Sequence, residues 1–515
     1  PGVQLDGFFN ALWSRQDQLR VVHTRHEQAT AYMADGYARV SGKEGVCVVV
    51  PGPGLLNAAA ALSTAYACNS PVLCITGQIK SDLIDHGRGM LHEIHDQVGM
   101  IRHITKSAER AVTPSEVPGL VDRAFAQLRS GRMRPVEIEV PLDILFAEES
   151  VTLSAGTPAR TYVSPDSARM DEAAAILAAA KTPLIYAGGG VLRGEAWSEL
   201  QQLAELLQAP IVMSANGKGA ISDRHYLAQN QVGELDLRPH ADVALIVGTR
   251  FLDNFSQPRP MNPDTKLIRI DIDPEEMTRD LNPDLQLVGD AKAGLAGLIE
   301  RLANTAGSRP SRKDELQAVK DAANARIFGM VPQGQYGQAM RDAVPDDGIF
   351  VGEMTQLGYW SNFGMPIYEP NTYITPGYQG TLGFGFCTAL GVKVAKPDTT
   401  VISINGDGGF GFALNELATM AQHNIAAITL VFNDSAYGNV KRIQEEDLGG
   451  RQIASSLRNP DYMALAGAFG VTGRRAESPA ALGTAITESI KANEPTLIEV
   501  PVGPMPNPWR ALGLR

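Results

Sequence analysis

A glycine and aspartate cluster between two apolar runs constrains this chain more than any other feature. Residues 400–404 are β-branched and lead into Gly406-Asp407-Gly408-Gly409, and residues 427–432 form a second apolar run that ends at Asn433-Asp434. Between them, residues 412–423 carry apolar side chains at roughly helical spacing. A strand, a helix and a strand in this order nearly always form a right-handed crossover between parallel strands. Both aspartates are therefore predicted to leave the carboxyl edge of one sheet.

Ligands of open α/β sheets bind outside that edge. Gly408 and Gly409 would let main-chain N–H groups approach a phosphate at the start of a helix. Two carboxylates beside a phosphate suit Mg²⁺ or Ca²⁺ better than a thiophilic metal. The alternative is a tight turn with a helix-capping aspartate, which is common turn chemistry. The cluster taken alone leaves both interpretations open.

Composition excludes several classes of protein. A chain of 515 residues is too long for one core and accommodates three domains. The net charge of −12 and the lack of a basic stripe argue against a nucleic-acid partner. The four cysteines are scattered in apolar runs, which is typical of a reduced, cytoplasmic protein. No apolar run is long enough to predict a membrane span, and no signal peptide is recognised. The chain starts at Pro1 without an initiator Met, so we expect a missing leading segment.

Three α/β blocks follow one another along the chain, and they predict an α/β fold with three doubly wound parallel-sheet domains. We place these domains at residues 1–150, 166–303 and 314–515, separated by polar joints at 150–165 and 304–313. The strands expected in the first two blocks lie at residues 19–23, 45–50, 71–76, 243–247 and 266–272, with a strand followed by a turn at 183–190, and the helices of the first block lie at 27–40 and 55–66.

A second signal lies far from the first. Glu27 stands where a strand is expected to give way to a helix, and an acidic residue in a first helical turn ordinarily only complements the helix dipole. However, RHEQ at 25–28 and GYAR at 36–39 are followed by Gly52-Pro53-Gly54 with Asn57, and by ITGQ at 75–78. Together with GDGG, these motifs resemble the thiamine-diphosphate-dependent enzymes of the acetolactate synthase, pyruvate oxidase and benzaldehyde lyase group. The resemblance covers nearly the whole chain and implies pyrimidine-binding, central and diphosphate-binding domains.

The resemblance also implies a metal site. Asp407 matches the first ligand of Mg²⁺, Asp434 occupies the position of the second, and the carbonyl of Ala436 is the third. The second position is usually asparagine in this family, and Asn433 falls one residue early. A carboxylate there adds negative charge beside the diphosphate, so we expect weaker cofactor binding or a sharper dependence on Mg²⁺. The residues that the resemblance assigns to the cofactor are Pro53, Asn57, Met354, Thr355, Thr381, the apolar wedge Leu382, Gly406, Gly408, Gly409, Tyr437 and Gly438.

Glu27 matches the glutamate that hydrogen-bonds the aminopyrimidine ring of thiamine diphosphate in this family. A carboxyl group removed from water can share a proton with a ring nitrogen, which promotes the cofactor tautomer that generates the reactive carbon. The resemblance implies that Glu27 reaches a cofactor held mostly by another subunit. We therefore expect a homodimer at minimum and a homotetramer as the full assembly.

The substrate pocket is less well defined. Gln4 stands where benzaldehyde lyase carries a histidine, and His92 stands where acetolactate synthases have a different pattern. A histidine in the cleft can act as acid or base near neutral pH. The alternative is that His92 and His95 are loop or surface residues. The first choice is an acetolactate-synthase-like carboligase that acts on 2-oxo acids. The alternatives within the family are a benzaldehyde-lyase-like ligase for aldehydes and hydroxyketones and a pyruvate-oxidase-like flavoenzyme.

The middle block raises the question of FAD. The segment between Asp223 and Ala241 is shorter than in FAD-binding synthases, and their Gly-Met-His-Gly stretch is absent from the sequence, so we expect no FAD. A nucleotide-binding dehydrogenase carries the glycine pattern G-x-G-x-x-G after a strand. Gly188-Gly189-Gly190 is not followed by a glycine at the last position of that pattern. A non-catalytic scaffold would not require these charged residues at the edges of its sheets.

Overall fold

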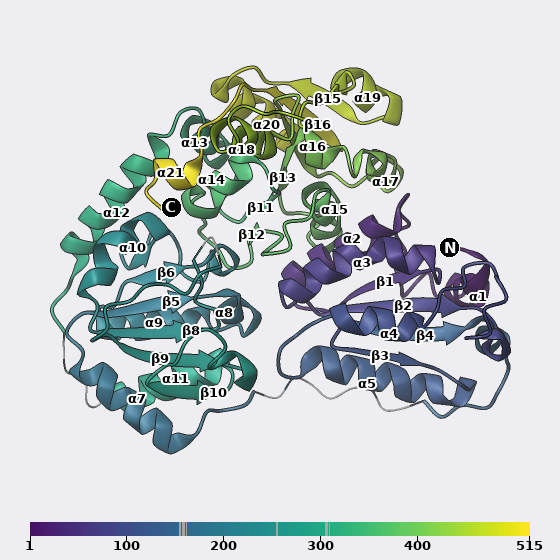
Figure 1. The fold of residues 1–515 in the computed structure, drawn as a ribbon, viewed down its shortest axis with the longest axis horizontal. Helices are drawn as coiled ribbons and strands as arrows, with labels where there is room; N and C mark the ends of the chain where they lie inside the picture. The colour runs from purple at the N-terminus through teal and green to yellow at the C-terminus, as the bar shows by residue number, and fades with distance from the viewer. Residues whose placement is uncertain are drawn as a thin grey trace. The chain divides into compact units, whose positions relative to one another are not determined.

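The computed structural model describes residues 1–515 except 154–155, 157–159, 161, 254–255, 304–306, 308 and 515. The chain divides into two compact units (Figure 1). Unit 1 comprises residues 1–160, 376–476 and 488–501, and unit 2 comprises residues 161–375, 477–487 and 502–515. The polar joints expected at 150–165 and 304–313 fall partly outside the described residues.

The first sheet of unit 1 is parallel and has the strand order β1-β2-β4-β3. Its strands are β1 (Gly45–Val49), β2 (Val72–Gln78), β3 (Ser107–Arg110) and β4 (Val136–Pro141). The sheet is accompanied by helices α1 (Asp6–Trp13), α2 (Glu27–Ser41), α3 (Pro53–Ala67), α4 (Gln97–Ile101), α5 (Val117–Arg129) and α6 (Leu142–Phe146). All residues of β4 are buried, as expected of a parallel sheet that is covered on both faces.

The second group of strands in unit 1 is also parallel and has the order β13-β14-β16-β15. These strands are β13 (Val401–Gly406), β14 (Ile428–Asn433), β15 (Thr472–Arg475) and β16 (Thr496–Pro501). The helices of this part are α15 (Phe384–Ala395), α16 (Asp407–Phe410), α17 (Leu417–Gln422), α18 (Gly438–Glu446) and α19 (Tyr462–Phe469).

The two parts of unit 1 meet where α2 crosses α15. A Cβ atom at Gly36 would collide with the carbonyl oxygen of Thr388, and one at Gly391 would collide with that of Met33. A glycine inside a helix is unfavourable by about 1 kcal/mol relative to alanine, so these two positions have a packing reason for it. The GYAR motif thus lies at a helix crossing.

Two polar residues beside this crossing, Asp35 and Arg39, explain the arginine of the motif. Asp35 and Arg39 form a buried ion pair one helical turn apart, with 2.8 Å between Arg39 Nη2 and Asp35 Oδ2. The guanidinium of Arg39 also lies over the ring of Phe384, 5.5 Å from its centroid. These residues therefore join α2 to α15.

Unit 2 contains a six-stranded parallel sheet of order β10-β9-β8-β5-β6-β7. Its strands are β5 (Pro183–Ala187), β6 (Ile211–Met213), β7 (Ala228–Gln229), β8 (Val243–Val247), β9 (Lys266–Asp271) and β10 (Leu285–Val288), and its helices include α7 (Ser167–Ala179), α8 (Gly189–Arg193), α9 (Trp197–Leu207), α10 (Gln231–Leu237) and α11 (Ala291–Leu302). The same unit holds α12 (Lys313–Phe328), α13 (Gln333–Ala343), α14 (Gln356–Gly364), α21 (Pro508–Ala511) and the parallel pair β11 (Ile349–Gly352) and β12 (Tyr373–Ile374). Helix α20 spans Pro479–Ala492.

The predicted fold class is confirmed, because three parallel sheets with helices form the fold. Two local predictions were wrong. Residues 19–23 form no strand, and Leu19 and Val21 are about half exposed, at 52% and 44%. The helix expected at 412–423 begins only at Leu414, as a 3-10 turn to Glu416 followed by α17.

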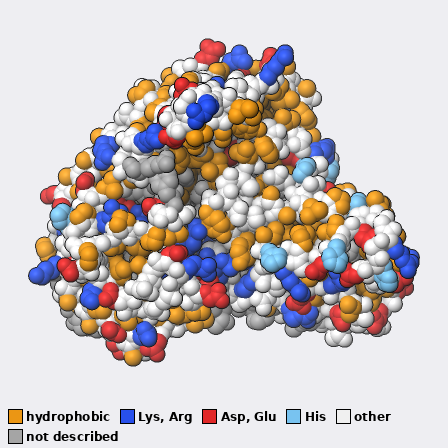
Figure 2. Space-filling model, viewed as in Figure 1, with side chains coloured by type: hydrophobic (Ala, Val, Ile, Leu, Met, Phe, Trp, Pro, Cys, Tyr) orange, Lys and Arg blue, Asp and Glu red, His pale blue; other side chains and the backbone are white. Residues whose placement is uncertain are grey.

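Charged side chains of both signs occur on the face that can be seen. Figure 2 shows acidic and basic side chains interspersed on that face. Among the described residues, none of the helices combines the length and apolar character that a membrane crossing requires.

Candidate active site

The structure brings Asp407 and Asp434 together. Strands β13 and β14 are parallel neighbours, with Gly406 opposite Phe432, and each aspartate follows its strand directly. Asp407 is buried, at 2% exposure. Burial raises the pKa of both carboxyl groups, and the neighbouring Asp407 contributes further to raising the pKa of Asp434 to about 6. Two like charges at one buried edge are unfavourable unless a cation offsets them.

The glycines after Asp407 lie at the start of a helix, as predicted. Strand β13 runs through Gly406, and α16 begins directly at Asp407, so Gly408 and Gly409 belong to its first turn. Packing explains one of these glycines, because a Cβ at Gly408 would lie 2.6 Å from the ring of Tyr437.

The loop after Asp434 is fixed by its own main chain. The N–H of Tyr437 donates to Ser455 O at 2.8 Å, and Ala436 pairs with Ser456 in an antiparallel bridge. The N–H of Ala436 donates to Asp434 Oδ1 at 3.2 Å. A Cβ at Gly438 would collide with Asp434 Oδ2, so this glycine leaves room for the carboxylate. The third predicted ligand, the carbonyl of Ala436, therefore belongs to an ordered loop.

Asn459 is a member of this site that the motifs did not reveal. Its Nδ2 donates to Asp407 Oδ2 at 2.6 Å and to Asn433 Oδ1 at 2.9 Å. The amide of Asn433 also donates to Glu499 Oε1 at 2.9 Å. The side chain of Asn433 is thus engaged by Asn459 and Glu499, which supports Asp434 as the metal-ligating candidate.

Glu27 lies at the start of α2, next to a predicted cofactor residue. Asn57 Nδ2 donates to Glu27 Oε2 at 3.0 Å. His26 is the N-cap of α2, and its side chain accepts the N–H of Gln28. Asn57 belongs to α3, whose first residue is Pro53. Two predicted residues from two motifs, Glu27 and Asn57, are therefore brought together.

Residues of the third block approach the same helices. The hydroxyl groups of Thr381 and Thr64 form a hydrogen bond of 2.8 Å, and Gln28 Nε2 donates to the carbonyl of Leu382 at 3.4 Å. The side chain of Leu382 is only partly buried. The predicted wedge segment is thus held against α2 and α3 within unit 1.

The two candidate substrate residues contact each other. Gln4 Oε1 lies 2.8 Å from His92 Nδ1, and Gln4 Nε2 donates to Leu91 O at 3.0 Å. Because the second bond fixes the Gln4 amide, its oxygen faces the imidazole and can only accept. When the ring is neutral, Nδ1 therefore carries the proton and Nε2 is the acceptor. His95, in contrast, is exposed.

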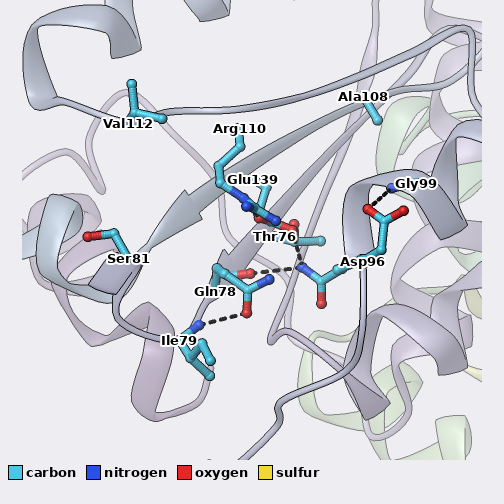
Figure 3. A network of polar contacts seen from close by, with 12 residues as sticks. Thr76, Gln78, Ile79, Ser81, Asp96, Gly99, Ala108, Arg110, Val112 and Glu139 are labelled. Atoms are coloured by element: carbon cyan, nitrogen blue, oxygen red, sulfur yellow. Dashed lines mark hydrogen bonds and ion pairs between the residues drawn. The ribbon is translucent and has the colours of Figure 1, made fainter. Parts of the chain in front are cut away.

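A buried polar network supports the Gly52–Pro53 loop. Gln97 is fully buried; its Oε1 accepts the N–H of Gly52 at 2.8 Å, and its Nε2 donates to Glu139 Oε2 at 2.7 Å and to Gly77 O at 3.2 Å. Glu139 in turn forms an ion pair with Arg110, and Figure 3 shows these two side chains pointing toward each other. Gln97 thus joins the ends of β1, β2 and β4.

Glu137 belongs to the same strand but has a different environment. Thr76 donates to one of its oxygens, and no described residue donates to the other. Burial, followed by the charge of Glu139, raises the pKa of Glu137 well above its usual range. Burial also raises the pKa of Glu139, but Arg110 and Gln97 oppose this shift.

These environments predict effects of different size for the same substitution. Because the folded state raises the pKa of Glu137, the free energy of unfolding falls as the pH rises above the unfolded pKa toward the folded one. The loss of unfolding free energy is about 1.4 kcal/mol for each unit by which folding raises the pKa. Glu137→Gln removes the titrating group and with it this loss, so the variant is more stable than the parent at pH 8. The pKa of Glu139 is raised less, because Arg110 and Gln97 oppose the shift, so Glu139→Gln gains less at pH 8 and also leaves Arg110 without its partner. Thermal unfolding midpoints at pH 5.5 and pH 8 test both, and equal shifts of the two variants would contradict the assignment.

Met354 and Thr355 lie in unit 2. Thr355 is the N-cap of α14, and both side chains are partly buried. The glycines of the central sheet pack against each other: a Cβ at Gly190 would lie 2.6 Å from Gly248 Cα, and one at Gly188 would collide with the Gly248 carbonyl. Close contact between the loops after β5 and β8 is sufficient to explain these glycines.

Comparisons with known proteins agree with this geometry. Residues 1–100, 170–298 and 353–500 match the N-terminal TPP binding, central and C-terminal TPP binding domains of thiamine pyrophosphate enzymes, TPP being another name for thiamine diphosphate.

Similar proteins span almost the full chain. A probable acetolactate synthase large subunit of Methanococcus aeolicus is 34% identical over 98% of this chain and 89% of that protein. A probable 2-ketoarginine decarboxylase, AruI, of Pseudomonas aeruginosa is 36% identical over 94% and 87%. The acetolactate synthase isozyme 3 large subunit of Escherichia coli is 30% identical over 91% and 85%. The three matching domains, the paired motifs and these relatives together show that the chain belongs to the thiamine pyrophosphate enzyme family.

Proposed function

We propose that the protein decarboxylates a 2-oxo acid and joins the resulting acyl unit to a second carbonyl compound, as an acetolactate-synthase-like carboligase. The observation that carries this proposal is the pairing of Glu27 with Asn57 in the same unit as the carboxylates of Asp407 and Asp434. The names of the similar proteins support a 2-oxo acid as the donor.

The residues fit the cofactor and its metal. Asp407, Asp434 and the Ala436 carbonyl are hard oxygen donors for Mg²⁺, and the raised pKa of both carboxyl groups is consistent with a site built to be neutralised by a cation. Thiamine diphosphate, when bound, supplies a carbon nucleophile and an electron sink for C–C bond chemistry. Glu27 would hold a proton at its carboxylate, Asn57 would orient that carboxylate, and Leu382 would contact the cofactor rings.

Cleavage of a 2-hydroxyketone without loss of CO₂ is the second candidate function. It is favoured by the Gln4–His92 pair, which presents Nε2 of a histidine with a defined tautomer. Such a nitrogen can accept the proton of a substrate hydroxyl group.

We also propose that the enzyme binds no FAD, since close packing accounts for the central glycines. The proposed assembly is a homodimer or a homotetramer in the cytoplasm. Helix α18 supports an assembly, because none of its residues is buried and Val440 and Ile443 are 49% and 37% exposed.

A substrate panel tests the proposal. The protein is assayed with thiamine diphosphate and Mg²⁺ against pyruvate, 2-ketoarginine and benzoin, reading CO₂ release and carboligation products, and its absorbance is inspected for flavin. We expect cofactor-dependent CO₂ release from a 2-oxo acid and no flavin band. Benzoin cleavage without CO₂ release would favour the second candidate. No cofactor-dependent turnover, together with no thiamine diphosphate binding by calorimetry, would overturn both.

A further inference from the structure

Glu416 is a fully buried carboxylate that lies between the two halves of unit 1. Its oxygens accept the main-chain N–H of Arg25 at 3.0 and 3.2 Å and the N–H of His26 at 2.9 Å. Asn415 and Thr419 donate to the same carboxylate. Its hydrogen bonds therefore join the segment that begins at Asp407 to the two residues that directly precede Glu27.

The other contacts at the start of α2 are local or come from side chains. Residues 19–24 before it form no helix or strand, so no sheet ladder fixes the approach to the helix. Thr24 Oγ1 donates to the carbonyl of His26 at 2.9 Å and shares a hydrogen bond of 2.6 Å with the hydroxyl group of Thr30. The His26 cap is local to α2, and the side chain of Arg25 makes a separate bond from Nη2 to Gln422 Oε1, at 2.7 Å. Hydrogen bonds to a charged acceptor are roughly twice as strong as neutral ones. The Glu416 carboxylate thus binds the main-chain N–H groups of Arg25 and His26 from a distant part of the sequence.

We propose that Glu416 is a positioning residue for Glu27: by binding the amides of Arg25 and His26 it sets where the Glu27 carboxylate stands. The inference rests on the proposed role of Glu27. Displacement of a reacting group by about 1 Å can lower a rate about 100-fold. Loss of Glu416 therefore reduces turnover through Glu27, although Glu416 itself contacts neither substrate nor cofactor.

Amide hydrogen exchange of the cofactor-free protein provides the first test, because it does not depend on activity. In Glu416→Ala, exchange at residues 25–28 is expected to accelerate at least about tenfold, while exchange at the α2–α15 crossing stays unchanged. Glu416→Gln keeps one acceptor oxygen and is expected to give a smaller change in a folded protein. The matched control is Gln422→Ala, which removes a contact to the Arg25 side chain only and should leave amide exchange unchanged. Unaltered exchange in both Glu416 variants would overturn the proposal.

A double-mutant cycle provides the second test. With Glu27 present, Glu416→Gln is expected to lower kcat at saturating thiamine diphosphate about tenfold and Glu416→Ala about 100-fold. In the Glu27→Gln background, the same changes are expected to lower the residual kcat by less than about twofold. Equal reductions in both backgrounds would mean that Glu416 acts independently of Glu27, which defeats the inference. If the parent enzyme has no cofactor-dependent turnover, the proposed function fails, and the exchange experiment still decides whether Glu416 holds the start of α2.

Discussion

Glu27→Gln is expected to lower cofactor-dependent turnover by at least about 100-fold, the usual contribution of a positioned acid or base. The amide keeps the shape of the side chain and can still bond to Asn57, which contacts one carboxylate oxygen at 3.0 Å. It cannot hold and release a proton in the way a carboxyl group does. The loss should therefore fall on kcat, with little change in the unfolding midpoint.

Calorimetry separates this loss from a binding defect. Thiamine diphosphate affinity of Glu27→Gln is expected to stay within about tenfold of the parent, because the proposed metal and diphosphate ligands are intact. Glu109→Gln is a suitable control, since Glu109 is a 42% exposed glutamate on β3 that pairs with Arg123 on the surface. Full activity of Glu27→Gln would remove the central residue from the proposed mechanism.

Substitutions at the two aspartates are expected to act in opposite directions. Asp407→Asn removes a proposed metal ligand, and since even outer-shell changes weaken metal binding about 10–100-fold, at least a 100-fold loss of Mg²⁺-dependent thiamine diphosphate affinity is expected. Asp434→Asn restores the residue usual in this family and removes the like charge beside Asp407. Two like charges about 4 Å apart repel each other by about 1–4 kcal/mol, so the Mg²⁺ concentration needed for half-maximal binding should fall about tenfold.

The cofactor-free proteins give an independent measurement. Two charged carboxylates at positions 407 and 434 repel each other in the folded protein. Asp434→Asn removes this repulsion and should raise the thermal unfolding midpoint of the cofactor-free protein at pH 7.5. A lower midpoint, or weaker cofactor binding in Asp434→Asn than in the parent, would show that this enzyme requires a carboxylate at position 434.

The pairing of Asp407 with Asp434 was predictable because the register of parallel strands depends on short apolar runs that are easily recognised. The contact between Gln4 and His92 could not be predicted, because the two residues are far apart in the sequence, and their place in a substrate pocket stays a prediction. The apolar run around Leu19 and Val21 formed no strand, since β propensity without a partner strand or a covered face is not sufficient.

The supporting carboxylates escaped prediction for a physical reason. In the strand sequence VEIEVP, alternation suggests that Glu137 and Glu139 face water, but the sheet is covered on both faces and both side chains are buried. Glu416 and Asn459 likewise interact with residues far away in the sequence, Arg25 and Asp407, and no local pattern encodes such partners. Only polar residues inside otherwise apolar segments could have signalled them.

The crossing of α2 and α15 has a consequence for how sequences of this kind can diverge. Gly36 and Gly391 each face a carbonyl oxygen of the opposite helix, so a side chain larger than hydrogen at either position would force the helices apart. Glu27 begins the helix that carries Gly36, and any separation or sliding of α2 would move it as well. Natural variants with alanine at either site should therefore be rare, or should carry a compensating reduction in size on the opposite helix. An inherited change far from the active site could in this way alter the catalytic carboxylate through helix spacing alone.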